Sequence, residues 1–436
     1  MEYLSVVAPV KERARQLYFS PTLRTITGLA GGNLMATVLG VIGSLVQARF
    51  VTPEDLGYFR GFSIATGYAF FLHLGLFGAL QRLYPYYIGK GEKERAIAVA
   101  EICQAWNVVV SAIVSGVFML LAVASLLSGN WRAMLGWLVQ AVAMAGFIYG
   151  GYLGATFRSG HDFATVAKGS VISSIVNTLT LPLFVVAPYI ALALRSSLGS
   201  LVSLIYMHVR RPLRLRWRFD WKEWLAITKE GMGIFIAGYG GSTGWGVVET
   251  SLILTFLGAP ALGLWSMSFM LLEAANKVAQ AITAVYIPRV TETFGRTDSV
   301  AQSMQLCRKP MLWGAPAMLG MAGAISLVLP YVVPILMPHY IAAIPTMSLM
   351  MLTLPIIVLE LPYTLLVAMG KTIEQNVATY VGLGGFALLA LLAIRLGLGL
   401  NGLVGASLVG RGVRLAMTWG FLYGATSGKG YARGID

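Results

Sequence analysis

Long apolar runs follow one another along nearly the whole chain, and only short polar turns separate them. Charged residues make up 11% of the sequence, whereas a water-soluble domain carries about 25%. The mean hydropathy is +0.73. A chain this apolar lacks the polar surface that water requires. We therefore expect an all-α membrane protein that crosses the bilayer many times, because helices satisfy their own backbone hydrogen bonds in lipid.

The apolar runs are long enough for membrane spans, each of which needs about 20 residues. We place twelve spans in the 436 residues, at 26–48, 58–80, 98–125, 132–153, 163–187, 189–208, 231–255, 261–285, 311–333, 341–368, 375–396 and 400–424. The connections are too short to hold a separate soluble domain.

Positive charge dominates the polar part of the sequence. The 32 Lys and Arg residues outnumber the 18 Asp and Glu residues, so the formal net charge is +14. Most of the basic residues fall in alternate loops, which is the distribution that fixes the orientation of membrane proteins. This distribution predicts that both termini lie in the cytoplasm. It also accounts for the net charge without a nucleic-acid partner, and no nucleic-acid-binding motif is present.

Residues 209–230 form the most basic connection in the chain, and Trp217, Trp221 and Trp224 accompany its arginines. Tryptophan beside arginine suits a segment that lies on the anionic cytoplasmic leaflet, in contact with membrane lipids. The segment predicts a division into an N-terminal six-span bundle, 1–208, a basic linker, 209–230, and a C-terminal six-span bundle, 231–436.

The two halves contain a matching motif. Phe50 is followed six and seven residues later by Leu56 and Gly57, and Phe256 is followed in the same way by Leu262-Gly263. A proline lies within each motif, and both motifs link the first two spans of their half. Six spans per half give both halves the same orientation. Parallel repeats of this kind build transporters whose substrate site lies between the halves.

The first of these motifs also resembles a family pattern. Residues 48–59 read Ala-Arg-Phe-Val-Thr-Pro-Glu-Asp-Leu-Gly-Tyr-Phe, and they are similar to the first-loop motif of polysaccharide flippases. These are the Wzx-type transporters of O-antigen and capsule precursors in the MOP superfamily. Further similarity lies in Leu329-Pro330, in Met337-Pro338-His339-Tyr340 and in Gly370-Lys371.

The resemblance implies two six-helix bundles around a central cavity, in the inner membrane of a bacterium. It implies that the cargo is an oligosaccharide linked to undecaprenyl diphosphate, flipped from the cytoplasmic to the periplasmic leaflet by alternating access. O-antigen and lipopolysaccharide synthesis would use this step, with polysaccharide polymerase machinery as a partner. Flippases for lipid II or another lipid-linked precursor, and MATE-type drug exporters, share the fold and remain alternatives.

Several basic residues fall within or beside the predicted spans. A charge at the bilayer centre costs about 2.5–3.5 kcal/mol, so such residues usually face water, a partner or the interface. Arginine can hold phosphate with two parallel hydrogen bonds. We therefore predict a cationic cavity for the diphosphate of the cargo. The candidates are Arg49, Arg60, Arg195, Lys277, Arg411 and Arg414. The alternative is that these residues snorkel to the interface or pair with acidic residues.

Three glutamates within the spans, Glu249, Glu273 and Glu360, are candidates for coupling transport to H⁺ or Na⁺. Glu273 and Lys277 are four residues apart on one helix, a spacing that predicts a neutralising ion pair. The alternative places Lys277 on the cargo and Glu273 in ion coupling. We expect no cofactor apart from such an ion.

Enzymatic function finds little support. No HExxH, Walker or DxD pattern occurs, so we assign no catalytic residues. The two cysteines, Cys103 and Cys307, are too few and too far apart for a metal site. A membrane glycan polymerase, the distant alternative, would need a larger external loop. An exporter of cationic drugs would need an acidic cavity, whereas basic residues outnumber acidic ones within these spans.

Overall fold

The computed structural model describes residues 37–160, 162–213 and 216–426. These residues form helices joined by short turns, and no strand occurs within the described ranges. Part of the first predicted span and both predicted cytoplasmic termini lie outside the described residues.

The described chain contains nine helices that are long and apolar enough to cross a membrane, which confirms an all-α multi-pass protein. Predicted span 8 and most of predicted span 7 lie in a single helical run, Gly240–Thr297, which is kinked where Gly258 has φ of +82°; the start of span 7 lies at the end of the preceding helix, Trp221–Tyr239. Two further predicted spans correspond to the shorter helix Thr37–Phe50 and to helix α18, Gly399–Thr426, which carries two arginines. Each predicted span therefore meets a helix in the described part of the chain.

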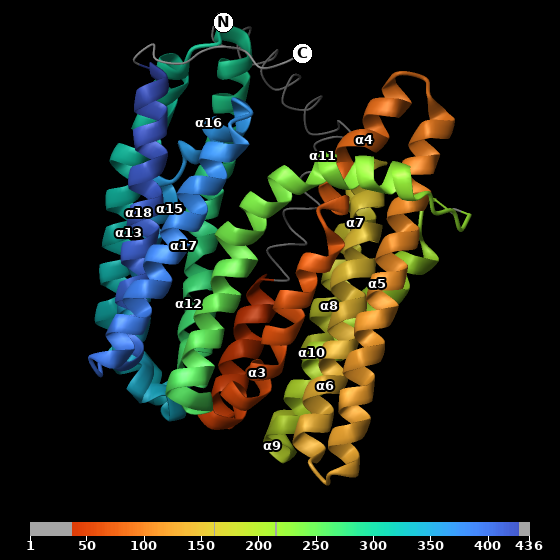
Figure 1. Cartoon of the computed structure of the whole chain (residues 1–436). Coiled ribbons are helices and arrows are strands. Elements are labelled where there is room, and N and C mark those ends of the chain that lie inside the picture. Colours follow the sequence, from red (N-terminus) through yellow and green to blue (C-terminus); the bar gives the residue numbers. More distant parts are fainter. Residues whose placement is uncertain (1–36, 161, 214–215, 427–436) are drawn as a thin grey trace, which may run out of the picture. The chain divides into compact units, whose positions relative to one another are not determined.

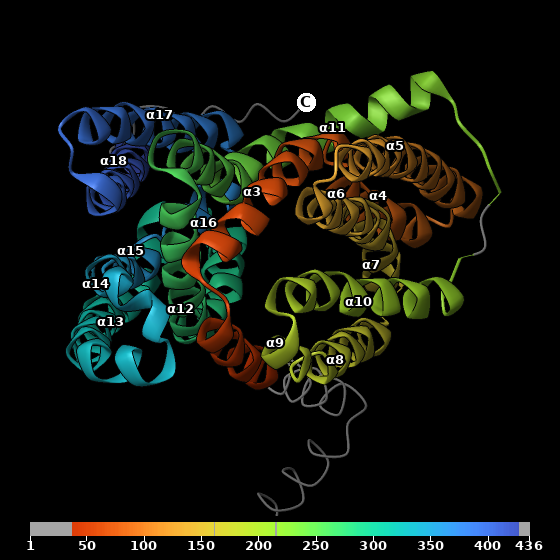
Figure 2. The same cartoon turned by 90° about the horizontal axis from the view of Figure 1, so that it is seen from below.

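The helices pack as two compact units. The first unit combines the described part of residues 1–44 with Leu76–Thr228. Its helices are α4 (Leu76–Gly89), α5 (Lys93–Leu127), α6 (Trp131–Met144), the π-helical turn η2 (Ala145–Tyr149), α7 (Gly150–Ser159), α8 (Phe163–Leu179), α9 (Leu183–Val186) and α10 (Pro188–Val209). Within this unit α6 packs against both α5 and α10, and α8 covers the other side of α10 (Figures 1 and 2).

The second unit combines Leu45–Gly75 with Lys229–Asp436. Its elements are α3 (Pro53–Ala69), η1 (Phe70–His73), most of α11 (Trp221–Tyr239), the π-helical turn η3 (Gly240–Gly244), α12 (Trp245–Thr297), α13 (Val300–Leu336), η4 (Pro338–Ala343), α14 (Ile344–Met351), α15 (Thr353–Leu359), α16 (Tyr363–Ala368), α17 (Thr372–Arg395) and α18. The packing thus groups Leu45–Gly75 with the C-terminal residues. The predicted functional division at 209–230 stays a prediction.

The start of α3 follows from its sequence. The Thr52 side chain accepts a hydrogen bond from the backbone N–H of Asp55 at 3.2 Å, and Pro53 occupies the first helical turn. Both are favoured at a helix N-terminus, because the hydroxyl satisfies a free N–H and proline has none to satisfy. The acidic Glu54 and Asp55 also suit the positive end of the helix dipole.

The two sequence repeats meet directly, because α3 packs along α12 within the second unit (Figure 2). A β-carbon placed on Gly57 would lie 1.7 Å from the carbonyl oxygen of Ala259. A β-carbon placed on Gly263 would lie 1.8 Å from the carbonyl oxygen of Pro53. Gly57 therefore contacts Ala259, four residues before Gly263, and Gly263 contacts Pro53, four residues before Gly57. The matching motifs form a reciprocal contact, and only glycine allows this approach of the backbones.

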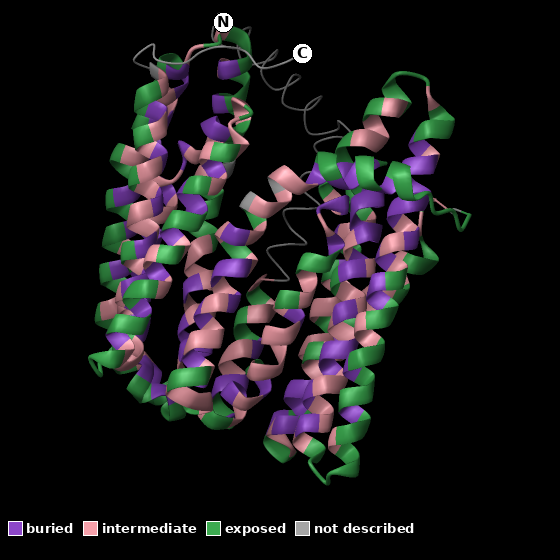
Figure 3. Cartoon of the chain, in the orientation of Figure 1, coloured by how far each residue is buried: buried purple, intermediate pink, exposed green. Residues whose placement is uncertain are grey.

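Large apolar side chains cover the outer faces of the helices. Figure 3 shows exposed positions along the length of α5, where Leu120 and Leu127 are 71% and 84% exposed. On α13, Trp313 and Tyr331 are likewise exposed. Such surfaces are stable in lipid and not in water, which agrees with a membrane location.

The central basic segment leads into α11. Trp224 is buried and packs against Trp106 of α5 with ring centroids 4.5 Å apart, whereas Trp217 and Trp221 are exposed. The Asp220 carboxylate accepts backbone N–H bonds from Lys222 and Glu223. These bonds, that from Glu223 first, hold the pKa of Asp220 below its usual value. Contact of the exposed tryptophans with anionic lipid stays a prediction.

Candidate functional site: a buried charge network in the second unit

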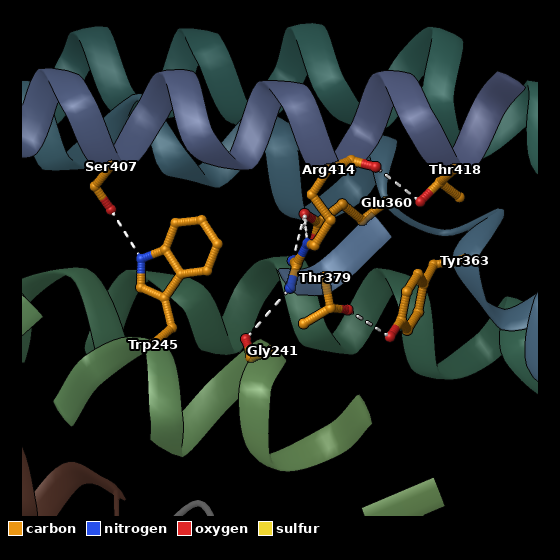
Figure 4. A network of polar contacts seen from close by, with 8 residues as sticks. All are labelled: Gly241, Trp245, Glu360, Tyr363, Thr379, Ser407, Arg414 and Thr418. Carbon is orange, nitrogen blue, oxygen red and sulfur yellow. Dashed lines mark hydrogen bonds and ion pairs between the residues drawn. The ribbon is translucent and has the colours of Figure 1, made fainter. Parts of the chain in front are cut away.

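Arg414, near the middle of α18, is the centre of a network of polar contacts (Figure 4). Its side chain is 10% exposed. Its Nε donates to Glu360 Oε1 at 3.0 Å, and its Nη2 donates to the same oxygen. Its Nη1 donates to the carbonyl oxygen of Gly241 at 3.3 Å. Arg414 therefore joins α18 to the end of α15 and to the start of the α12 region.

Gly241 can accept this bond because it lies in the π-helical turn η3, between α11 and α12. A π turn interrupts the regular hydrogen-bond ladder, and such turns are frequent at functional sites. Two tyrosines complete the surroundings. Tyr380 of α17 donates to the carbonyl oxygen of Ile236 at 3.0 Å, and the Tyr363 hydroxyl lies 3.2 Å from that of Thr379.

Trp245, the first residue of α12, is 1% exposed and lies beside the network. Its ring stacks on Phe386 with centroids 5.4 Å apart, and its Nε1 donates to Ser407 Oγ at 3.2 Å. The Arg411 guanidinium lies over the same ring, 5.0 Å from its centroid. An aromatic face attracts a cation through its quadrupole, so Trp245 stabilises the position of Arg411.

The three glutamates that the sequence nominated for ion coupling all act on Arg411 electrostatically. Glu249 is one turn beyond Trp245 on α12 and is 4% exposed. Ser407, Trp265 and Arg411 lie near its carboxyl group, and it forms no ion pair with any described residue. Glu360 is held by Arg414, as described above. Three glutamates thus lie within electrostatic range of Arg411. Glu249 and Arg414 are buried, whereas Glu273, Glu360 and Arg411 are half-buried.

Glu273 and Lys277 do not form the expected ion pair in the described structure. Glu273 Oε1 instead accepts from Asn276 Nδ2 at 3.4 Å. Lys277 is exposed and forms no ion pair with a described residue. The expected neutralising pair was therefore wrong, and the i, i+4 spacing did not determine the contact.

The remaining candidates lie elsewhere. Arg60 of α3 is exposed, and its guanidinium has no hydrogen bond or ion pair to a described residue. Arg49 is also exposed and donates to the carbonyl oxygen of Ile335 at 2.5 Å. Arg195 belongs to the first unit, where it donates to the carbonyl oxygen of Gly40 at 3.4 Å. Of the six basic candidates, the structure therefore brings only Arg411 and Arg414 into the network.

The fold is shared with solved transporter structures. The chain is similar to the inward-facing conformation of a multidrug-resistance MATE family transporter of the MOP superfamily, with 15% identity, a TM-score of 0.70 and coverage of 90% of this chain and 94% of that one. It is similar to the inward closed conformation of the lipid II flippase MurJ, with 12% identity, a TM-score of 0.67 and coverage of 91% and 87%.

A MOP superfamily transporter from Pyrococcus furiosus, described as having a binding pocket of reversed polarity, aligns with 15% identity, a TM-score of 0.59 and coverage of 94% and 97%. No family model matches the sequence, and no curated protein matches it. The solved structures above show that the chain has the MOP transporter fold, and its long apolar helices show a multi-pass membrane protein. The similar structures above are transporters and a flippase rather than enzymes.

Proposed function

We propose that the chain is a flippase for an oligosaccharide linked to undecaprenyl diphosphate, moved from the cytoplasmic to the periplasmic leaflet of a bacterial inner membrane by alternating access. The fold supports membrane transport, and the first-loop motif at 48–59 supports a glycan cargo. A lipid II flippase would use the same chemistry on another lipid-linked sugar.

The observation that carries an anionic cargo is a pair of uncompensated cations, Arg60 and Lys277. Arg60 lies on α3 and Lys277 on α12, each within a helical run that is apolar enough to span the membrane, and both are exposed. Neither forms an ion pair with a described residue. A cation left facing lipid would be costly, so we assign these two groups to a water-filled path and to the diphosphate of the cargo.

The network around Arg414 suits a different role. Its carboxylates outnumber its guanidinium groups, so it would not attract a second anion. We propose that it carries the coupling ion, H⁺ or Na⁺, and that Glu249 takes this ion because Arg414 already occupies Glu360. The same excess of acid favours the second candidate function, export of a cationic compound by a MATE-like transporter.

Replacing Arg60 or Lys277 with glutamine should reduce the rate of flipping of the lipid-linked oligosaccharide by about tenfold or more, the loss expected for one charge-assisted contact to phosphate. The measurement is the appearance of the labelled oligosaccharide in the outer leaflet of proteoliposomes. Arg289→Gln, on the same helix as Lys277 but near its predicted cytoplasmic end, should flip at the normal rate. Equal rates in all variants would contradict the proposal.

Identifying the cargo needs a second measurement, in cells that lack the protein. The proposal expects an undecaprenyl-diphosphate oligosaccharide to accumulate in the cytoplasmic leaflet. Accumulation of lipid II would assign the chain to the alternative flippase class. Normal lipid-linked intermediates, together with increased sensitivity to a cationic drug, would overturn the flippase proposal in favour of export.

Glu249→Gln should make flipping independent of an imposed ion gradient, because the amide keeps the size of the carboxyl group and cannot change its charge. Separate gradients of H⁺ and Na⁺ across the proteoliposome membrane identify the ion. Glu374→Gln is the control, because Glu374 forms only a partly exposed ion pair with Lys371. A Glu249→Gln protein with unchanged gradient dependence would remove Glu249 from ion coupling.

A further inference from the structure

Three side chains meet at one end of the first unit, and the flipping scheme above uses none of them. The hydroxyl of Tyr149 lies 2.7 Å from Nδ1 of His208. Nη1 of Arg211 lies 2.5 Å from Nε2 of the same imidazole, and it also donates to the His208 carbonyl oxygen at 3.2 Å. The histidine ring therefore bridges a phenol and a guanidinium group.

The donors and acceptors in this cluster can be assigned. A guanidinium group only donates, so Nε2 of His208 must accept from Arg211. The imidazole is then neutral and carries its proton on Nδ1, which donates to the Tyr149 oxygen. This arrangement leaves the hydroxyl hydrogen of Tyr149 without an acceptor among the described residues. Arg211 keeps further N–H groups on Nη2 and Nε, and neither group bonds to a described residue.

The side chains of the cluster are held by helical backbone and by a buried tyrosine. Tyr149 ends the π-helical turn η2, which interrupts the helix between α6 and α7. Its ring stacks on Tyr152 with centroids 6.1 Å apart and an angle of 21° between the planes. Tyr152 is 2% exposed, and its hydroxyl donates to Gln104 Oε1 at 3.3 Å. His208 lies in the last turn of α10, and Arg211 follows two residues after that helix ends.

The charge of Arg211 is not neutralised within the described structure. Glu101 and Arg211 both lie within electrostatic range of Tyr152. However, Glu101 Oε1 accepts from the backbone N–H of Arg216 at 3.2 Å, and no carboxylate of the described residues forms an ion pair with Arg211. The cluster therefore offers a positive charge and free donors at a defined position.

We propose that Arg211, held by His208 and Tyr149, binds a phosphate oxyanion. Arginine suits this ligand because two of its N–H groups can meet two phosphate oxygens at once, and the Tyr149 hydroxyl supplies a third donor. His208 is a positioning residue that orients both donors. The proposal rests on the flippase function, because it gives the diphosphate a contact in the first unit, beside the basic loop that the sequence places in the cytoplasm.

The phosphate can belong to the cargo or to a bilayer lipid, and the probes separate these sources. Binding is measured on the purified full-length chain, with inorganic pyrophosphate and farnesyl diphosphate as cargo-like probes in detergent. Exchange of phosphatidylglycerol for phosphatidylcholine in nanodiscs is the lipid arm. Arg211→Gln should weaken binding of at least one probe by about tenfold, as expected for one lost charge-assisted contact. Arg210→Gln is the matched control with the same change in charge, and it should change affinity less than twofold.

The positioning role has its own readout. His208→Gln keeps an acceptor for Arg211 and a donor for Tyr149, so it should bind close to the normal level. His208→Ala removes both ring contacts and leaves Arg211 only its bond to the backbone carbonyl, so its binding should fall between those of His208→Gln and Arg211→Gln. Normal binding by Arg211→Gln, or an equal loss in Arg210→Gln, would overturn the proposal. Because binding is measured without transport, this failure is distinct from a failure of the flipping assay with the Arg60 and Lys277 variants.

Discussion

Replacing Arg414 with leucine is expected to destabilise the folded protein by about 3–5 kcal/mol, the cost of removing one partner of a buried ion pair. The change leaves the carboxylate of Glu360 without its main counter-charge. It also removes the donor to the carbonyl oxygen of Gly241, so the π-helical turn η3 loses a stabilising contact. The measurement is thermal unfolding of the purified protein in detergent, followed by intrinsic fluorescence.

A double replacement tests this explanation. The double variant Arg414→Leu/Glu360→Gln removes both charges. It should recover much of the stability lost in Arg414→Leu, because no uncompensated charge remains. Arg414→Lys keeps the charge but not the planar fork, so its stability should be intermediate. If the double variant is as unstable as the sum of the two single variants, the pair does not contribute as an ion pair.

The Gly57→Ala and Gly263→Ala variants should both lose stability, each at or above the upper end of the ~1–3 kcal/mol range for overpacked sites. In each case the new methyl group would meet a backbone carbonyl oxygen, which cannot turn away as a flexible side chain can. The two effects should be similar in size, because the two contacts are reciprocal. Thermal unfolding and the yield of folded protein in the membrane fraction are the measurements.

Gly246→Ala is the control for these two variants. Gly246 lies on the same helix as Gly263, and a β-carbon placed on it would meet nothing within 4 Å. Alanine also has the higher helix propensity, so this variant should be as stable as the natural protein or slightly more stable. If Gly57→Ala behaves like Gly246→Ala, the backbones are further apart than the structure shows.

The helical architecture could be predicted from the sequence, because the apolar runs that determine it are local. A membrane span needs a long apolar run, and each of the twelve predicted runs meets a helix in the described part of the chain. The repeat was also readable, since Phe50 to Gly57 and Phe256 to Gly263 share their spacing. The sequence did not show that these two motifs contact each other, because that contact depends on how distant helices pack.

The charged residues of the network were predicted from the sequence, but their contacts with one another were not. Glu360 and Arg414 are 54 residues apart, and no periodicity within one helix can pair them. Trp245 was missed because a tryptophan in an apolar run gives no signal of its own. A signal was available on α18, where Ser407, Arg411, Arg414 and Thr418 repeat at helical spacing. Three of these four residues are buried, so the polar stripe marks a face that turns into the protein.

The reciprocal contact of Gly57 and Gly263 has the form of an isologous interface, in which a surface is complementary to a second copy of itself. Symmetric homodimers are built in this way from two chains, and here one chain supplies both copies. Two copies of a half-length chain, each with one motif, would bring together the same kind of glycine and carbonyl oxygen in both directions. The two motifs therefore share one constraint, and a side chain introduced into either glycine position disturbs the backbone of the other half.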